Sequence, residues 1–277
     1  MKRENIHANF FNKLIKESGN IIDALKLMLP PEIWKRLDFH SIEFDDSSYV
    51  DDKLANSFSD MVIKTKLKEE NQLTDIYVLL EHKSSKPKKD DLFFQILKYV
   101  YNMWLTDYSS KHQFRVIIPL VFYHGKQKWN LPERFKDLFQ VTDEVKKIIL
   151  DFGYVLYNTN NIGDLELQKA TENAFLVSGL ISLKHGFERE KIENVINIIE
   201  YMYSSRLFNE KQKVEYVLRY LSLRYELTIE KIRAILEKLT IKRSNTMKTF
   251  LDYYEEKGIE KGKKETAKKM LAEGFDF

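Results

Sequence analysis

The sequence contains no cysteine and only nine glycines and five prolines among its 277 residues. The lack of cysteine excludes disulfides, thiolate metal sites and thiol nucleophiles, so any chemistry has to come from other side chains. The scarcity of glycine and proline excludes collagen-like or low-complexity character. Hydrophobic residues make up 43% of the chain and aromatic residues 13%, which is ample material for the core of a globular protein.

Long apolar segments are also missing. No run of 18 apolar residues occurs, so we expect no membrane-spanning helix. The N-terminal stretch MKRENIHANFFNKLIKES has a basic start but lacks the continuous apolar segment and small-residue cleavage site of a secretion signal. We therefore expect the chain in the cytoplasm, without a membrane partner.

No large excess of charge of one sign is present. The 45 Lys and Arg residues against 42 Asp and Glu give a formal net charge of +3. The overall charge does not favour a nucleic-acid partner, and binding to DNA would need a local basic patch. The length is close to the upper size of one compact domain, so a core with an appendage is expected.

The spacing of apolar residues predicts an α/β fold with a helical C-terminal module. In chain order we expect a helix over residues 7–29 with a break near Gly19, a meander of three strands over 42–46, 58–67 and 74–81, a helix from Asp90 to about Tyr108, a strand over 115–123 and a strand around 154–157. The order is thus helix, three strands, helix, strand.

Two further local expectations follow from the pattern. Pro119 lies inside a near-continuous apolar run and predicts a bulge or an interrupted ladder in that strand. In the helix that begins at Asp90, helical spacing predicts a place in the core for four aromatic residues: Phe93, Phe94, Tyr101 and Trp104.

Helical periodicity dominates from Asp164 onward. We therefore divide the chain into a domain over residues 1–160, a helical domain over 161–254 and a basic C-terminal tail over 255–277. Six lysines and two glutamates lie between Lys257 and Lys269 without an apolar stripe. Such a tail could contact a DNA backbone or a second protomer.

Acidic and basic residues alternate at the end of the third predicted strand, in the sequence Glu81-His82-Lys83. Residues two apart share a face of a strand, so Glu81 and Lys83 are expected side by side. The preceding hairpin would bring Asp60 back toward Glu81. Two carboxylates and the backbone carbonyl of His82 would form an oxygen-rich site suited to Mg²⁺, and Lys83 could orient or activate an attacking water.

Simpler interpretations of the same residues stay open. An Asp or a Glu-x-Lys triplet on a surface strand often forms only an ion pair. Asp51 or Asp52 could replace Asp60 if the hairpin register differs, although their surroundings are typical of a turn. A further acid, Asp75, is six residues from Glu81, which is about 20 Å along a strand and too far to join the site.

Basic residues also follow this strand, because the loop over residues 83–89 contains four lysines. Lys86, Lys88 and Lys89 are therefore candidate contacts to DNA phosphates, although a charge run on a solvated surface is an equally plain interpretation. His124, in the sequence Tyr-His-Gly at the end of a strand, could face the same cleft or belong to a structural turn. The histidines show no spacing that would indicate zinc.

Taken in order, these segments resemble a known family. The spacing Asp60, twenty residues, then Glu81-His82-Lys83 resembles the signature of the PD-(D/E)XK nuclease superfamily. More narrowly, the chain is similar to the Rpn, or YhgA-like, family of recombination-promoting nucleases. That similarity rests on segments within about residues 7–130 and, more weakly, on the glycine-spaced tail: Leu29-Pro30-Pro31, Phe58-Ser-Asp-Met-Val62, Leu79-Leu80-Glu81-His82-Lys83-Ser84-Ser85, the helix with Gln95 and Tyr99, and Pro119-Leu-Val-Phe-Tyr-His-Gly125 before Trp129.

The resemblance implies a Mg²⁺-dependent DNA endonuclease that acts in recombination, mobile-element biology or phage defence. It implies Asp60 and Glu81 as metal ligands, Lys83 as the catalytic lysine and Gln95 as an accessory polar group, while Tyr99 could pack on a sugar or fill the core. A homodimer is expected, because two sites related by a twofold axis suit the cutting of both strands.

Two other functions remain compatible with the sequence. The first is a catalytically inactive DNA-binding or transposition accessory protein on the same fold. The second is a protein-interaction module that acts through its helical half.

Overall fold

The computed structural model describes residues 5–17, 19–45, 61–68, 73–81, 86–188, 190–228, 231, 234–235 and 238–239, with residues 5, 73–81 and 208 described by their backbone alone. The chain forms two compact units that divide between Phe187 and Glu188. The first unit is α/β, and the described part of the second is helical.

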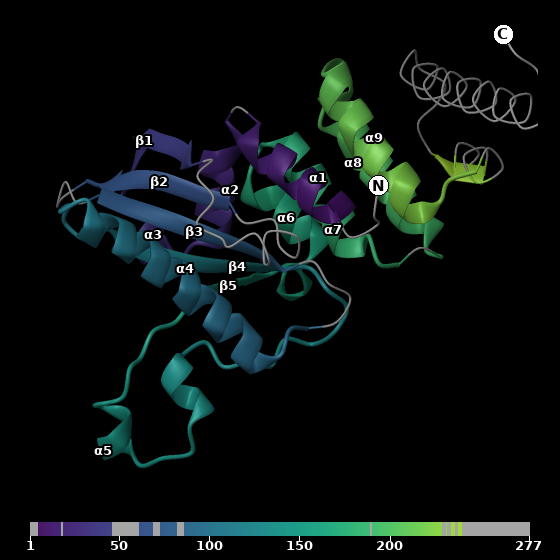
Figure 1. The fold of residues 1–277 in the computed structure, drawn as a ribbon. Helices are drawn as coiled ribbons and strands as arrows, with labels where there is room; N and C mark the ends of the chain where they lie inside the picture. Colours follow the sequence, from purple (N-terminus) through teal and green to yellow (C-terminus); the bar gives the residue numbers. More distant parts are fainter. Residues whose placement is uncertain are drawn as a thin grey trace, which may run out of the picture. The chain divides into compact units, whose positions relative to one another are not determined.

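A five-stranded sheet forms the centre of the first unit (Figure 1). Strands β1 (Leu37–Asp45), β2 (Met61–Leu67) and β3 (Leu73–Glu81) form an antiparallel meander. Strand β4 (Val116–Tyr123) is parallel to β3, and β5 (Val155–Asn158) is parallel to β4. The predicted order of helix, meander, helix and strand is confirmed.

Helix α4 (Lys89–Ser109) connects β3 to β4 and lies on one side of the sheet. Asp90 and Asp91 in its first turn match the partial positive charge of a helix N-terminus. The helix packs its apolar face on the sheet through Phe93 and Ile96, which are fully buried. Residues of β2, β4 and the segments that follow β4 complete this core: Val62, Val121, Tyr123, Trp129 and Tyr154.

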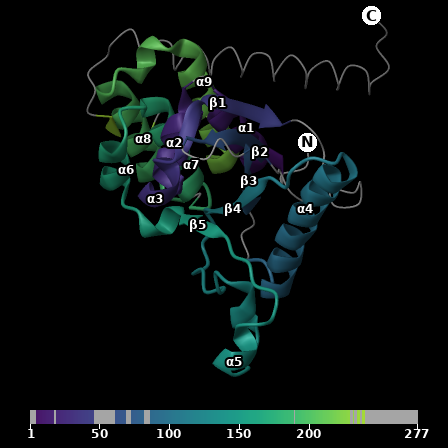
Figure 2. The same ribbon diagram turned by 90° about the vertical axis from the view of Figure 1, so that its left-hand side faces the viewer.

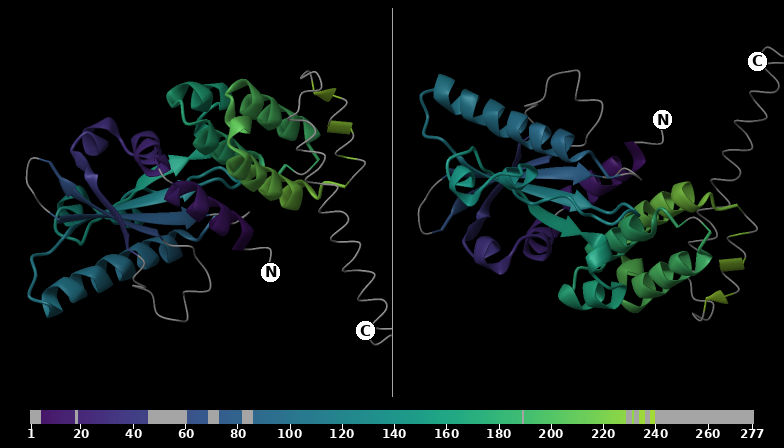
Figure 3. Two further views of the ribbon diagram at one scale, coloured as in Figure 1. Left: turned by 90° about the horizontal axis from the view of Figure 1, so that it is seen from above. Right: turned by 90° about the horizontal axis from the view of Figure 1, so that it is seen from below.

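Helices α1 (Asn5–Lys16), α2 (Asn20–Met28) and α3 (Pro31–Trp34) precede the sheet. Figures 2 and 3 show α2 and α3 on the side of the sheet opposite α4. The break expected near Gly19 is confirmed, since Gly19 separates α1 from α2 with a φ of 84°, in the left-handed region that glycine adopts without a steric cost. Each helix can therefore take its own direction.

The core opposite α4 is built on α1 and α7 (Ala174–His185). The ring of Phe11 in α1 lies 4.5 Å from the ring of Phe122 in β4, between centroids. A Cβ atom on Gly179 of α7 would lie 2.5 Å from the Leu14 side chain of α1, so this glycine lets the two helices approach closely. Between β5 and α7 lie η2 (Thr159–Asn161) and α6 (Asp164–Ala170).

A longer excursion joins β4 to β5 and contains η1 (Phe135–Leu138) and α5 (Asp143–Lys146). It projects from the sheet in Figure 1. The second unit contains α8 (Ile192–Ser204), η3 (Leu207–Asn209) and α9 (Lys211–Tyr225), which contact one another. None of the helices that the structure describes has the length and apolar character needed to span a membrane.

Several sequence predictions need correction. Strand β1 begins at Leu37 rather than near residue 42, because its first residues pair with the end of β2 across an irregularity between Asp38 and Glu43. No bulge occurs at Pro119, where the β3–β4 register is continuous; the β4–β5 ladder begins at the next residue, Leu120. A proline is tolerated there because it lies just outside the second ladder.

The prediction of a core position is right for Phe93 and wrong for the other three aromatic residues of α4. Phe94, Tyr101 and Trp104 are 65%, 59% and 44% exposed. Helix α4 covers the sheet with one face only, and these side chains lie outside that face.

The predicted domain boundary near residue 160 differs from the division between the compact units, because α6 and α7 belong to the unit that contains the sheet. The boundary stays a prediction about functional modules. The tail over 255–277 lies outside the described residues.

Candidate functional site

The carboxyl ends of β3 and β4 lie side by side at one edge of the sheet. Glu81, the last residue of β3, pairs in register with Tyr123, the last residue of β4. The start of β2 lies at the same edge, since Met61 pairs with Val78 of β3. In α/β sheets, ligands bind outside the carboxyl ends of parallel strands, so this edge is the candidate site.

The structure describes only one of the predicted metal ligands. The backbone of Glu81 is described, whereas Asp60, His82 and Lys83, and the alternatives Asp51 and Asp52, lie outside the described residues. The antiparallel pairing of β2 and β3 confirms the hairpin on which the prediction rests. Strand β3 is continuous from Leu73 to Glu81, which keeps Asp75 near its opposite end. Among the described side chains, no group of three or more His, Asp or Glu residues could hold a metal ion.

The register also decides which face of the sheet Glu81 belongs to. Val62 and Tyr123, which face α4 in the core, pair with Tyr77 and Glu81. Because paired residues belong to the same face and faces alternate along a strand, Glu81 holds a position on the α4 side.

Helix α4 brings Gln95 and Tyr99 to this side of the sheet. Tyr99 is 4% exposed and packs in the core with Val62 and Val121, so it fills the core. Gln95 is half-buried, and its Nε2 is buried without a hydrogen-bond partner among the described residues. A buried amide without a hydrogen-bond partner destabilises the folded state by about 1–3 kcal/mol. Such a group in a native protein needs an explanation, and one explanation is a bound ligand that accepts its hydrogen bond.

The lysines after β3 have different environments. The ammonium group of Lys86 donates to Asn130 Oδ1, and its backbone N–H donates to Gln127 Oε1 at 3.0 Å. Lys88 and Lys89 are exposed at the N-terminus of α4. Sequence reasoning did not identify Gln127 and Asn130 as partners of this loop. The polar sequence directly after β4 could have indicated that Gln127 and Asn130 contact this loop.

His124 does not face the candidate site. It is fully buried, its Nδ1 lies 3.2 Å from the carbonyl of Leu183 in α7, and its ring packs on Phe122 and Phe187. These residues belong to the core opposite α4. His124 is therefore part of the scaffold, as the alternative of a structural turn predicted.

Comparison with known proteins identifies the family. Residues 5–213 match the family model described as "Putative transposase, YhgA-like". The chain belongs to this YhgA-like family. The match covers the whole sheet of the first unit, as well as α8 of the second.

Two curated relatives of this YhgA-like chain are known by name. The recombination-promoting nuclease RpnD of Escherichia coli O157:H7 is 26% identical over 132 residues, which are 45% of this chain and 48% of the relative. The recombination-promoting nuclease RpnA of Escherichia coli strain K12 is 28% identical over 120 residues, 43% of this chain and 40% of the relative. The chain thus matches less than half the length of these relatives, and no solved structure is significantly similar to it.

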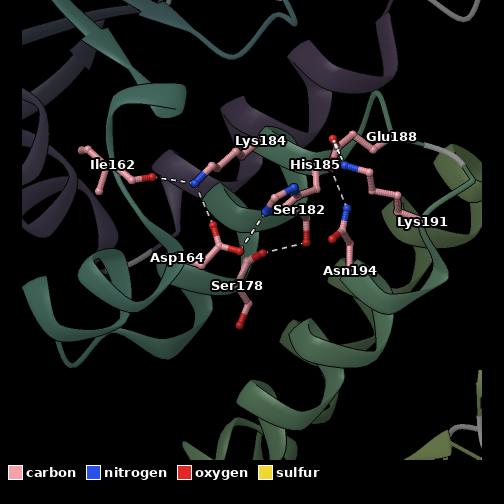
Figure 4. Close-up of polar contacts among 9 residues, drawn as sticks. All are labelled: Ile162, Asp164, Ser178, Ser182, Lys184, His185, Glu188, Lys191 and Asn194. Carbon is pink, nitrogen blue, oxygen red and sulfur yellow. Dashed lines mark hydrogen bonds and ion pairs between the residues drawn. The ribbon is translucent and has the colours of Figure 1, made fainter.

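A second polar cluster lies in the family-matched span, away from the end of β3 in the sequence (Figure 4). Asp164 accepts hydrogen bonds of 2.8 Å from Lys184 Nζ and His185 Nε2, and Lys184 also donates to the carbonyl of Ile162. Burial raises the pKa of Asp164, but the two basic partners outweigh burial and lower the pKa to about 2. The cluster joins the start of α6 to the end of α7, and its carboxylate is paired with basic side chains, as in a structural ion pair.

Proposed function

We propose that this YhgA-like chain is a Mg²⁺-dependent DNA endonuclease with a PD-(D/E)XK core. One observation carries the proposal: Glu81 ends β3 beside the end of β4, on the face covered by α4. The antiparallel hairpin of β2 and β3 supports a place for Asp60 at the same edge. The two relatives are named recombination-promoting nucleases, and this name agrees with the class of reaction that we propose.

The donor set fits magnesium. In this proposal Asp60, Glu81 and the backbone carbonyl of His82 hold the ion, and all three offer the hard oxygen atoms that Mg²⁺ prefers. The bound ion would supply Lewis acidity toward a phosphate oxygen. The amide of Gln95, which has no partner among the described residues, offers an N–H donor to a water or phosphate oxygen on the same side of the sheet.

The protein side chains then act on water and phosphate. Lys83 donates hydrogen bonds that orient the attacking water and neutralise charge that develops on the phosphate. The water oxygen forms a bond to phosphorus and the water gives up one proton to solvent. The ester P–O bond breaks, and the departing oxygen takes up a proton from solvent. Lys86, Lys88 and Lys89 contact neighbouring phosphates through charge.

We further propose that two copies act together as a homodimer on the two strands of a duplex, which light scattering of the purified protein tests. The names of the relatives support a role in recombination, and action on mobile elements or in phage defence, in the cytoplasm, belongs to the same proposal. Assays of phage resistance and of transposition in cells with the substituted gene test these roles.

Plasmid cleavage tests the catalytic proposal. We expect supercoiled plasmid to be nicked with Mg²⁺, and we expect Asp60→Ala, Glu81→Gln and Lys83→Ala to reduce the rate by about 10²-fold or more. Asp75→Asn, on the same strand but at its other end, is the matched control and should retain the rate. Wild-type cleavage by a folded Glu81→Gln variant would refute the assignment. DNA binding without cleavage by the wild type would favour the inactive DNA-binding protein instead.

A further inference from the structure

A second loop of the structure presents lysines beside the candidate site. Directly after β4, the sequence His124-Gly125-Lys126-Gln127-Lys128-Trp129-Asn130 forms what we call the KQK loop. Its central residues, Lys126, Gln127 and Lys128, are exposed. Because β4 ends in register with Glu81, this loop starts at the edge where the proposed chemistry takes place.

Buried residues hold both ends of the KQK loop. At the first end His124 is fully buried, and the carbonyl of Gly125 accepts a 2.7 Å hydrogen bond from the Asn160 side chain. At the other end Trp129 is 9% exposed, and its ring lies 4.8 Å from the ring of Tyr123. The two lysines at the tip are therefore displayed on a fixed base.

The KQK loop is also tied to the lysine loop that precedes α4. Gln127 accepts the backbone N–H of Lys86, and Asn130 accepts from the Lys86 ammonium group. The hydroxyl of Tyr123 in turn donates to the Gln127 carbonyl at 2.6 Å. All these acceptors are neutral, and Lys86 forms no ion pair with any residue that the structure describes, so the contacts that join the two loops do not neutralise its charge.

The joined loops form a local basic surface. Residues 86–91 and 124–130 contain five lysines against two acids, Asp90 and Asp91, a local net charge of +3. The whole chain of 277 residues carries the same net charge. In the described part of the chain, Lys88, Lys89, Lys126 and Lys128 form no ion pair. Their charges are thus available to an anionic partner.

We propose that Lys126 and Lys128 bind backbone phosphates of duplex DNA and, with Lys88 and Lys89, hold the strand across the carboxyl ends of β3 and β4. This inference rests on the proposed function and adds the residues that position its substrate. Lysines on two fixed loops suit phosphate contacts, which set the position of a duplex without reading its sequence. Asn130 and Gln127 act as positioning residues that hold Lys86.

The salt dependence of DNA binding tests this inference. Binding is measured in EDTA, without divalent ions, to a duplex oligonucleotide at several salt concentrations. For Lys126→Gln/Lys128→Gln we expect the slope of log K against log salt to fall in magnitude by up to about 1.8, because each phosphate that the protein no longer neutralises removes about 0.9 from the slope. The charge-conserving pair Lys126→Arg/Lys128→Arg should retain the wild-type slope.

The control variant is Lys147→Gln/Lys169→Gln, which removes two exposed lysines elsewhere in the first unit. It should leave the slope unchanged. A wild-type slope for the folded Lys126→Gln/Lys128→Gln variant, an equal fall in the control, or no DNA binding by the wild type would overturn the inference. Cleavage is scored separately: binding that depends on these lysines without any Mg²⁺-dependent nicking would reject the nuclease proposal alone.

Discussion

The most deeply buried ion pair of the described residues lies where α4 returns to the sheet. Asp107, near the end of α4, is 1% exposed, and Arg115, just before β4, is 9% exposed. The backbone N–H of Arg115 donates to Asp107, as do its Nε and Nη2 atoms. Burial raises the pKa of Asp107, but the hydrogen bonds and charge of Arg115 lower it overall. The pair fixes the turn between the helix and the strand.

Breaking this pair should be costly. We expect Asp107→Ala to destabilise the protein by about 3–5 kcal/mol, because the guanidinium of Arg115 would remain buried without its partner. The double variant Asp107→Leu/Arg115→Met should cost much less, since neither charge remains. Urea unfolding measures both. The pair Lys191–Glu188, whose lysine is exposed, gives the comparison. Lys191→Ala should cost about 1 kcal/mol or less, and an equally small loss for Asp107→Ala would contradict a large contribution from the buried pair.

At the scale of elements, helix ends in the first unit are joined by charge. Asp164 is the first residue of α6, where a carboxylate is favourable, and Lys184 and His185 lie in the last turn of α7, where cations are favourable. The contacts between them therefore add to two favourable interactions with helix dipoles. The hydrogen bonds and charges of His185 and Lys184 lower the pKa of Asp164 although its carboxylate is partly buried.

The lowered pKa makes a prediction about stability and pH. An unfolded Asp titrates near 3.9, whereas Asp164 titrates at about 2 in the folded protein. Its stabilising contribution is thus fully present above about pH 4 and is lost as the pH falls through about 2. We expect this contribution to the unfolding free energy to be about 1 kcal/mol, because the Asp164 side chain is 34% exposed and water screens its charge from that of Lys184.

The measurement is the difference in unfolding free energy between the wild type and Asp164→Asn from pH 6 to pH 2. The difference should shrink toward the acid end of this range. The control is Glu172→Gln, which removes an exposed acid nearby in the sequence. The difference in unfolding free energy between the wild type and this variant should not shrink as the pH falls toward 2. Parallel curves for the wild type and Asp164→Asn would disprove the coupling.

For the whole molecule, the small net charge conceals an uneven distribution. The +3 of the chain is matched by the +3 of the two loops beside β3 and β4, so the rest of the chain is balanced on average. The proposed binding of DNA would therefore use one basic surface, while the overall charge of the chain stays close to neutral.

The proposed binding of Mg²⁺ predicts a change in the thermal stability of the protein. A ligand that binds only the folded state stabilises it by mass action, by about 2.7 kcal/mol at 100 times Kd. We expect Mg²⁺ to raise the Tm of the wild type and EDTA to reverse the change. Glu81→Gln should abolish the response, while Glu172→Gln should keep it. A response to Mg²⁺ that survives Glu81→Gln would place the ion elsewhere.

Much of the fold followed from local pattern. The break at Gly19, the three-strand meander and the long helix after it were predictable, because periodicity and turn residues report short-range structure. The bulge expected at Pro119 was not found, since whether a proline disturbs a ladder depends on where the neighbouring strand begins. The exposure of Phe94, Tyr101 and Trp104 likewise depended on which face of α4 meets the sheet.

For the candidate site, the sequence by itself determined the residue types and their order: a Glu-x-Lys strand end, an acid one strand earlier and a lysine loop. Only the tertiary structure decided that β4 ends beside Glu81, that the Nε2 atom of Gln95 is buried without a hydrogen-bond partner in the described residues, and that His124 belongs to the opposite core. It also joined the KQK loop to Lys86. The reason is physical: strand periodicity is local, whereas strand neighbours and loop contacts arise between residues about 40 positions apart.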